Sequence, residues 1–173
     1  MRALWALLLI LLSLNVPLYA KGTYMSVSAF VDSSFSGTVS PAPEKLWLKG
    51  DQRRRLEVIL GHPVGLRIGF WREGERSAWV LDEIGKELPI TIGLVIDAGR
   101  LSDIQILAFR ESRGGEVRYP FFTRQFVGMT LGNDFRLSDS IDGISGATMS
   151  VDAVTRAAVA ALYLDSLLPH LPS

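Results

Sequence analysis

The chain has 173 residues, 48% of them hydrophobic, which is enough to build the core of one ordinary domain. Its 18 lysines and arginines balance its 18 aspartates and glutamates, so it lacks the basic field that holds a nucleic-acid backbone, and we expect no nucleic-acid partner. Because cysteine is absent, disulfides, thiolate zinc sites, iron–sulfur clusters and a cysteine-attached haem are excluded, and electron transfer would need an organic cofactor.

The first 20 residues are typical of an export signal. Arg2 provides a positive start, and residues 3–14 form an apolar run. Leu18 is bulky for the position two residues before cleavage after Ala20, and the run approaches bilayer-spanning length, so an uncleaved membrane anchor is the alternative. Whether this segment is a cleaved signal or an anchor, we expect residues 21–173 to lie outside the cytoplasm, in the periplasm or at the outer face of the inner membrane.

Residues 21–43 are expected to form an N-terminal segment and linker, and residues 44–173 the main domain. A short helix is predicted at about 26–35, where Val27, Phe30 and Val31 recur at helical spacing.

The main domain is expected to begin with a strand-like stretch at 45–48. A helix follows, capped by Asp51, ended by Gly61 and exposing the arginines 53–55 to solvent. Neither His62 nor His170 is expected to bind a metal; both are interpreted as exposed loop residues.

Two hairpins are predicted from alternating apolar residues. The first joins residues 66–70 to 77–81, and the second joins 88–96 to 101–109. They predict an antiparallel sheet of about four strands. The connection at 82–87 is interpreted as a polar loop rather than an acid–base site, although it contains the neighbouring carboxylates of Asp82 and Glu83.

A long C-terminal helix is predicted over 151–168, where one apolar stripe can pack on the sheet. The fold class is therefore expected to be α+β: an antiparallel sheet packed by a long C-terminal helix, with short N-terminal helices.

The most informative stretch, residues 142–150, comes directly before this helix. The first N–H groups of a helix lack internal partners and carry the positive end of its dipole, so a phosphate can bind there. Gly146 and Ala147 would let it approach the main chain, and the hydroxyls of Ser145, Thr148 and Ser150 could donate to it or attack it. From these residues alone, a plain helix cap is the commoner explanation.

Residues 142–150 resemble the flavinylation motif of the FMN-binding domain family, D-x-x-[ST]-G-A-T-x-[ST]. That family includes the flavin-carrying subunits of the sodium-pumping NADH:quinone reductase and of the Rnf electron-transfer complex. In it, a flavin transferase moves FMN from FAD onto a threonine hydroxyl as a phosphoester and releases AMP. The resemblance implies Thr148 as the acceptor, and the other motif positions fall on Asp142, Ser145, Gly146, Ala147 and Ser150.

The resemblance extends more loosely to a glycine-containing segment after the second hairpin, which lies near the flavin in the family. Here that segment contains Glu111, Gly114 and Gly115, and a mobile surface loop is the alternative interpretation. The aromatic patch that follows is either core or a set of contacts to the flavin ring, and its candidates are Tyr119, Phe121 and Phe122.

The resemblance implies a flavoprotein that carries electrons between membrane-associated redox partners, with the flavin transferase as its maturation partner. No substrate-turnover residues stand out, so a stand-alone enzyme is the weaker interpretation. A reductase that binds FMN without a covalent bond and a non-redox envelope domain remain the alternatives.

Overall fold

The computed structural model describes residues 22–37 and 39–169. The predicted export signal and His170 lie outside these residues. The chain runs in the order α2 (Val27–Ser34), β1 (Glu44–Trp47), α3 (Gly50–Leu60), β2 (Arg67–Glu73), β3 (Arg76–Ile84), β4 (Pro89–Asp97), β5 (Arg100–Phe109), η1 (Gly115–Arg118), α4 (Pro120–Thr123), η2 (Arg124–Phe126) and α5 (Thr148–Ser166).

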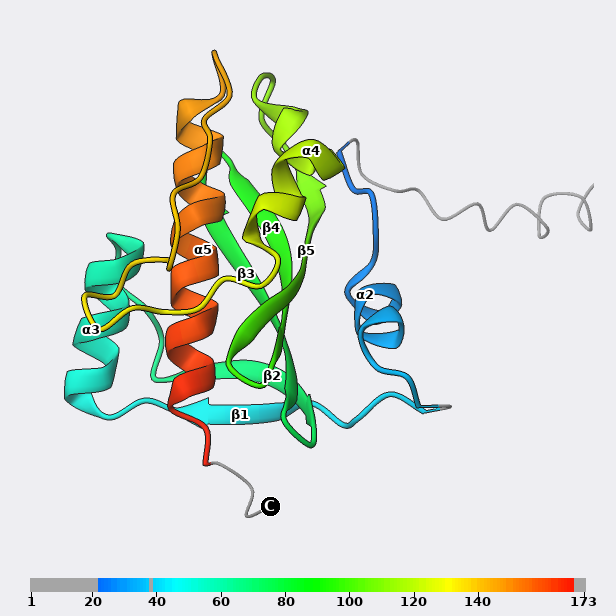
Figure 1. Ribbon diagram of the computed structural model, residues 1–173, viewed down its shortest axis with the longest axis vertical. Coiled ribbons are helices and arrows are strands. Elements are labelled where there is room, and N and C mark those ends of the chain that lie inside the picture. The colour runs from blue at the N-terminus through cyan, green and yellow to red at the C-terminus, as the bar shows by residue number, and fades with distance from the viewer. Residues whose placement is uncertain (1–21, 38, 170–173) are drawn as a thin grey trace, which may run out of the picture.

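The strands form one antiparallel meander in the order β1-β2-β3-β4-β5 (Figure 1). Both predicted hairpins are present, and the α+β class is confirmed. The sheet has one strand more than the four expected, because the stretch at 45–48 pairs with β2, placing Leu46 opposite Ile68.

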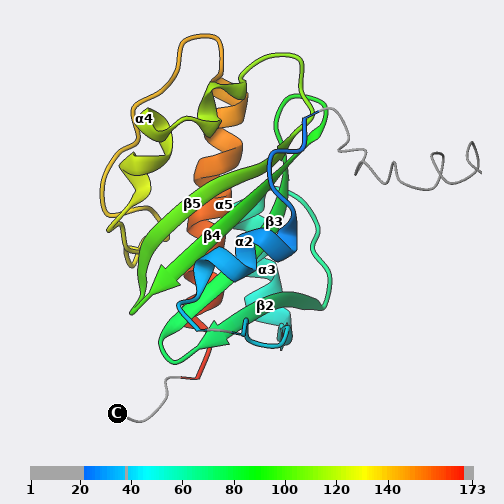
Figure 2. The same cartoon turned by 90° about the vertical axis from the view of Figure 1, so that its right-hand side faces the viewer.

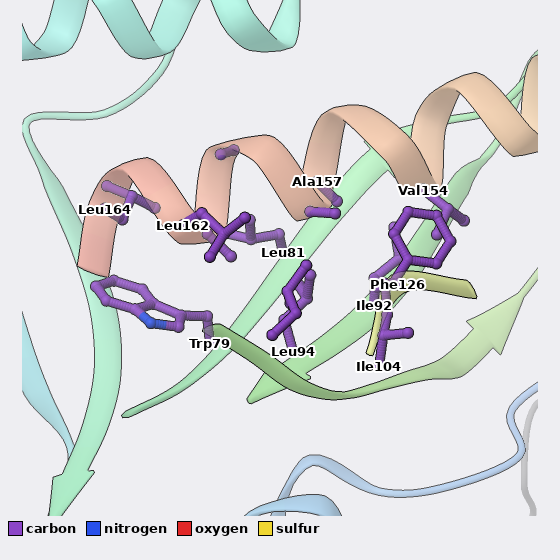
Figure 3. Packing of buried hydrophobic residues seen from close by; sticks show 14 of the residues in the cluster. Trp79, Leu81, Ile92, Leu94, Ile104, Phe126, Val154, Ala157, Leu162 and Leu164 are labelled. Atoms are coloured by element: carbon purple, nitrogen blue, oxygen red, sulfur yellow. The ribbon is translucent and has the colours of Figure 1, made fainter. Parts of the chain in front are cut away.

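The long helix α5 covers one face of the sheet and α2 lies on the other (Figure 2). Figure 3 shows Trp79, Leu81 and Leu94 pointing from the strands toward α5. Five alanines of α5 are fully buried, which lets the helix backbone pack closely against its neighbours: Ala153, Ala157, Ala158, Ala160 and Ala161. The helix that begins at Thr148 is therefore held along most of its length.

On the opposite face, α2 is held by a large aromatic side chain over a glycine. Phe30 is fully buried, and a Cβ added to Gly93 would lie only 2.7 Å from its ring. Glycine at this point of β4 is what allows the Phe30 ring to pack directly against the strand. The helix predicted at 26–35 is thus confirmed and docked on the sheet.

The cap predicted for the next helix is wrong. The structure begins α3 at Gly50 with Lys49 at the N-cap position, and Asp51 lies inside the first turn. The side chain of Gln52 accepts the Lys49 N–H at 2.8 Å, which satisfies the end of the helix without a carboxylate cap.

The interpretation of residues 82–87 as a polar loop is also wrong in its first half, because β3 continues to Ile84. Glu83 is 1% exposed, and its carboxylate lies 2.8 Å from His62 Nε2 and 3.3 Å from Arg156 Nε. His62 is therefore an ion-pair partner rather than only an exposed loop residue. Burial of a carboxylate is tolerated here because both its oxygens have charged or hydrogen-bonding partners.

Within the two described ranges, no helix is long and apolar enough to cross a membrane.

Candidate functional site

The site is built around the first turn of α5, which begins at Thr148. Ala147 occupies the N-cap position, and no side chain caps the helix. Among the described residues, the backbone N–H groups of Thr148, Met149 and Ser150 donate to no acceptor, and the first helical bond is Val151 N–H to Ala147 O. The plain-cap interpretation therefore does not account for the hydroxyls, and the positive end of a 19-residue helix is left open.

The loop before the helix explains why small residues precede Thr148. Gly146 has a φ of +80°, the left-handed conformation that favours glycine. Ala147 is buried, and its N–H donates to Ile144 O at 3.0 Å, which closes the turn. The side chain of Thr148 is then left exposed at the helix start.

A pocket of about 560 Å³ opens at this turn. Two loops and the helix start meet there, contributing Lys86, Glu111, Ser112, Arg113 and residues 146–150. The pocket thus combines unpaired backbone donors, hydroxyls and two cationic side chains, which is the donor set that a phosphate group prefers.

One wall of the pocket is fixed by Glu111. Its Oε1 accepts the backbone N–H groups of Lys86, Glu87 and Leu88 at 2.7, 2.5 and 2.8 Å. These hydrogen bonds lower the pKa of Glu111, and the bond from the Leu88 N–H has the largest effect. The carboxylate therefore stays ionised at neutral pH. A charged acceptor for three adjacent donors orders the turn that presents Lys86 to the pocket.

The predicted glycine segment packs directly against the helix start. Gly114 has a φ of +86°, and a Cβ added there would lie 3.3 Å from Ser150 Cβ, 3.5 Å from Ala147 Cβ and closer still to Ser150 Oγ. Gly115 lies beside the ring of Phe109. The structure therefore brings the Glu111–Gly115 segment and the Thr148 loop together in close packing, in place of a free surface loop.

A second hollow of about 590 Å³ adjoins the first and shares Glu111 and Ser112 with it. Leu88 and Phe109 provide its apolar lining, and Tyr24 lies at its side. A flat ring system needs apolar walls of this kind beside its phosphate site.

The remaining predicted residues lie outside both hollows. Asp142 is exposed, and its N–H donates to the Gln125 side chain at 2.7 Å; Ser145 is exposed as well. Tyr119 and Phe121 are exposed and stack on each other at 6.3 Å, whereas Phe122 is fully buried, edge-on to Phe126. Their roles as flavin contacts stay predictions.

Sequence reasoning missed four residues of the pocket: Lys86, Ser112, Arg113 and Met149. The register of the second hairpin could have found the first, because Ile90 pairs with Phe109 and the residues before Ile90 must then lie beside Glu111.

Comparison with known families bears directly on this pocket. Residues 85–163 match the family model of the FMN-binding domain. The matched segment contains every residue that lines the first pocket, from Lys86 to Ser150, so the resemblance predicted from the motif is confirmed and FMN is supported as the flavin. No curated protein matches the chain.

The residues of the matched segment and of the chain beside it fit FMN in two respects. The open N–H groups of Thr148, Met149 and Ser150 can hold its phosphate, and the hollow beside Leu88 and Phe109 offers apolar surface to its ring.

Proposed function

We propose that the protein carries FMN on Thr148 through a phosphoester and transfers electrons between membrane-associated partners outside the cytoplasm. The observation that carries the proposal is the position of Thr148. Thr148 is exposed on the uncapped first turn of α5 and occupies the acceptor position of the family motif. It also lines the pocket of about 560 Å³.

In the attachment step, Thr148 Oγ forms a bond to the flavin-side phosphorus of FAD and loses its proton. The pyrophosphate bond breaks and AMP leaves, so charge and atoms balance without water or an oxidant. A threonine hydroxyl is a weak nucleophile and needs a base or metal to activate it. Glu111 is a poor base because its lowered pKa and three N–H partners stabilise the ionised form, so the flavin transferase must supply this activation.

After attachment, the chain positions the phosphate rather than reacting further. The free N–H groups of the first turn and the helix dipole stabilise an anion there by about 0.3–1 kcal/mol, and Lys86 and Arg113 add nearby positive charge. The flavin supplies the redox chemistry. Because a covalent bond already retains the cofactor, the protein can leave part of the ring accessible to partners.

The proposal is tested by expressing the full chain with a flavin transferase, followed by acid precipitation. Flavin is expected in the pellet for the unchanged protein and absent from it for Thr148→Ala. Thr155→Ala is the matched control, since this threonine lies two turns along the same helix with its hydroxyl bonded to Val151 O at 2.8 Å. Flavin released into the supernatant would instead indicate a non-covalent reductase, and a colourless product in both fractions would indicate a non-redox domain.

A further inference from the structure

The first described residues, 22–24, here called the entry point, lie at the end of the molecule that contains the flavin pocket. The Phe109 N–H donates to Gly22 O at 2.7 Å, and the Tyr24 N–H donates to Leu107 O at 2.8 Å, so residues 22–24 are bound to the end of β5. Gly22 and Tyr24 also line the second hollow. Figure 1 shows this point at the same end of the molecule as the start of α5, whereas the C-terminal end of α5 lies at the opposite end.

The apolar run at 3–14 ends a short distance from this point in the sequence. Seven residues lie between its last residue, Leu14, and Gly22, so about eight residue-to-residue steps of at most about 3.6 Å each join the two. The pocket-end entry point therefore cannot lie farther than about 30 Å from the end of the apolar run.

An exposed group of side chains, here named the aromatic cluster, surrounds the same entry point. Arg118 lies 4.8 Å from the ring centroid of Tyr24 and 4.7 Å from that of Tyr119, and it donates to both hydroxyls at 2.7 and 2.6 Å. Tyr119 stacks on Phe121, which is 61% exposed. Among the described residues no carboxylate lies within ion-pair distance of Arg118, although Asp103 lines the same hollow, so the cluster presents aromatic surface and a positively charged side chain.

Amphipathic tyrosines, an exposed phenylalanine and an arginine are the combination found where proteins meet lipid headgroups. We propose that the aromatic cluster rests on the lipid surface of the membrane to which the N-terminal segment leads, so that the flavin pocket faces that membrane. The role of this contact rests on the proposed function, because a pocket that faces the lipid can exchange electrons with partners in or on the bilayer.

The test uses the full chain in liposomes of phosphatidylcholine and phosphatidylglycerol without any other protein. Because the chain has no cysteine, single nitroxide labels can be placed by Arg124→Cys and by Val58→Cys. Arg124 borders the hollow that contains Tyr24 and Arg118, whereas Val58 is a 73% exposed residue of α3. The label at 124 is expected to collide severalfold more with oxygen, relative to a water-soluble nickel complex, than the label at 58.

Replacing Tyr119 and Phe121 together by serine is expected to abolish this difference. Val127→Ser is the matched control, because this apolar side chain is 53% exposed and follows η2 outside the aromatic cluster, and it should preserve the difference. Equal exposure of both labels to water overturns the inference. If the label at 124 is shielded from the nickel complex only when membrane proteins are added, the cluster binds a protein partner and the inference is overturned. If it stays shielded in detergent while the protein is a dimer, the cluster binds a second copy and the inference is likewise overturned.

The label measurement does not require flavin. Protein without covalent FMN that still shows lipid contact would defeat the proposed function alone, and flavinylated protein without lipid contact would defeat this inference alone.

Discussion

Thr148 is exposed on an uncapped helix turn, and its neighbours explain why the hydroxyl stays accessible. Gly146 provides the left-handed turn before it, and Gly114 allows the adjacent segment to pack against Ser150. Both glycines lie where a side chain would change the shape of the pocket.

At residue scale, Gly114→Ala is expected to lower the free energy of unfolding by about 2–3 kcal/mol, because a left-handed φ and crowding against Ser150 both oppose the methyl group. Gly128→Ala is the control, since its φ of +87° is similar but nothing lies within 4 Å of an added Cβ; it should cost about 1 kcal/mol. Urea unfolding of both variants measures the difference. Equal losses would show that the close packing against Ser150 carries no energy.

Glu111→Gln is expected to loosen the turn at 86–88, because three N–H groups lose a charged acceptor, at a cost of about 1–3 kcal/mol. Hydrogen exchange of the Lys86, Glu87 and Leu88 amides should accelerate. Glu87→Gln is the control, because its carboxylate is 72% exposed and makes only a 3.5 Å pair with Lys86. Unchanged exchange in Glu111→Gln would remove Glu111 as the fixing residue.

The pH dependence of Glu111 has a definite sign. Its pKa is lowered in the folded state, so its contribution to stability is present above the ordinary glutamate pKa and is lost as pH falls through the folded value. The stability difference between the unchanged protein and Glu111→Gln should therefore shrink in acid.

At the scale of elements, the Glu83 carboxylate joins the end of β3 to α5 and to the segment after α3. His62 Nε2 and Arg156 Nε contact its two oxygens, and Arg156 also donates to Ile84 O at 3.1 Å. This network connects α5 to the strand that leads into the pocket-lining turn.

The hydrogen bond to Glu83 raises the pKa of His62. A raised pKa gives stability that is fully present below the ordinary histidine value of about 6.5 and is lost as pH rises through the folded value. His62→Gln should therefore reduce the free energy of unfolding at pH 6 more than at pH 9. Thermal unfolding across this range measures it, and a pH-independent difference would contradict a charged His62.

Local patterns predicted the elements well, because both hairpins and the last helix carry their own periodicity. The motif at 142–150 likewise predicted a loop that leads into a helix, since its residues are contiguous, but the helix begins at Thr148 rather than at the predicted residue 151. The Glu83 network could not be predicted in this way, because His62 and Arg156 lie 21 and 73 residues away in sequence. The position of Lys86 in the pocket depends on the register of β4 and β5. The start of α3 depends on backbone geometry that the presence of Asp51 did not reveal.

At the scale of the whole molecule, the matched segment 85–163 supplies the pocket but not the complete core. The chain before it adds α2 on one face of the sheet and α3 beside α5 on the other (Figures 1 and 2). These additions stabilise the scaffold on which the pocket is built.

Phe30→Ala is therefore expected to lower the free energy of unfolding of the whole domain by about 3–5 kcal/mol, because this fully buried ring fills the space over Gly93. Val27→Ala on the same helix is the control, since its side chain is 40% exposed and should cost much less. Cooperative unfolding by urea, followed by tryptophan fluorescence, measures both. A small loss for Phe30→Ala would mean that α2 is not part of the cooperative unit.

Peptide mass spectrometry of the chain, after expression with a flavin transferase, measures whether Thr148 carries FMN. The peptide containing Thr148 should gain the mass of one FMN less one water, with fragment ions placing it on Thr148 rather than Ser145 or Ser150. An unmodified Thr148 peptide from protein that has met an active transferase would contradict the proposed attachment.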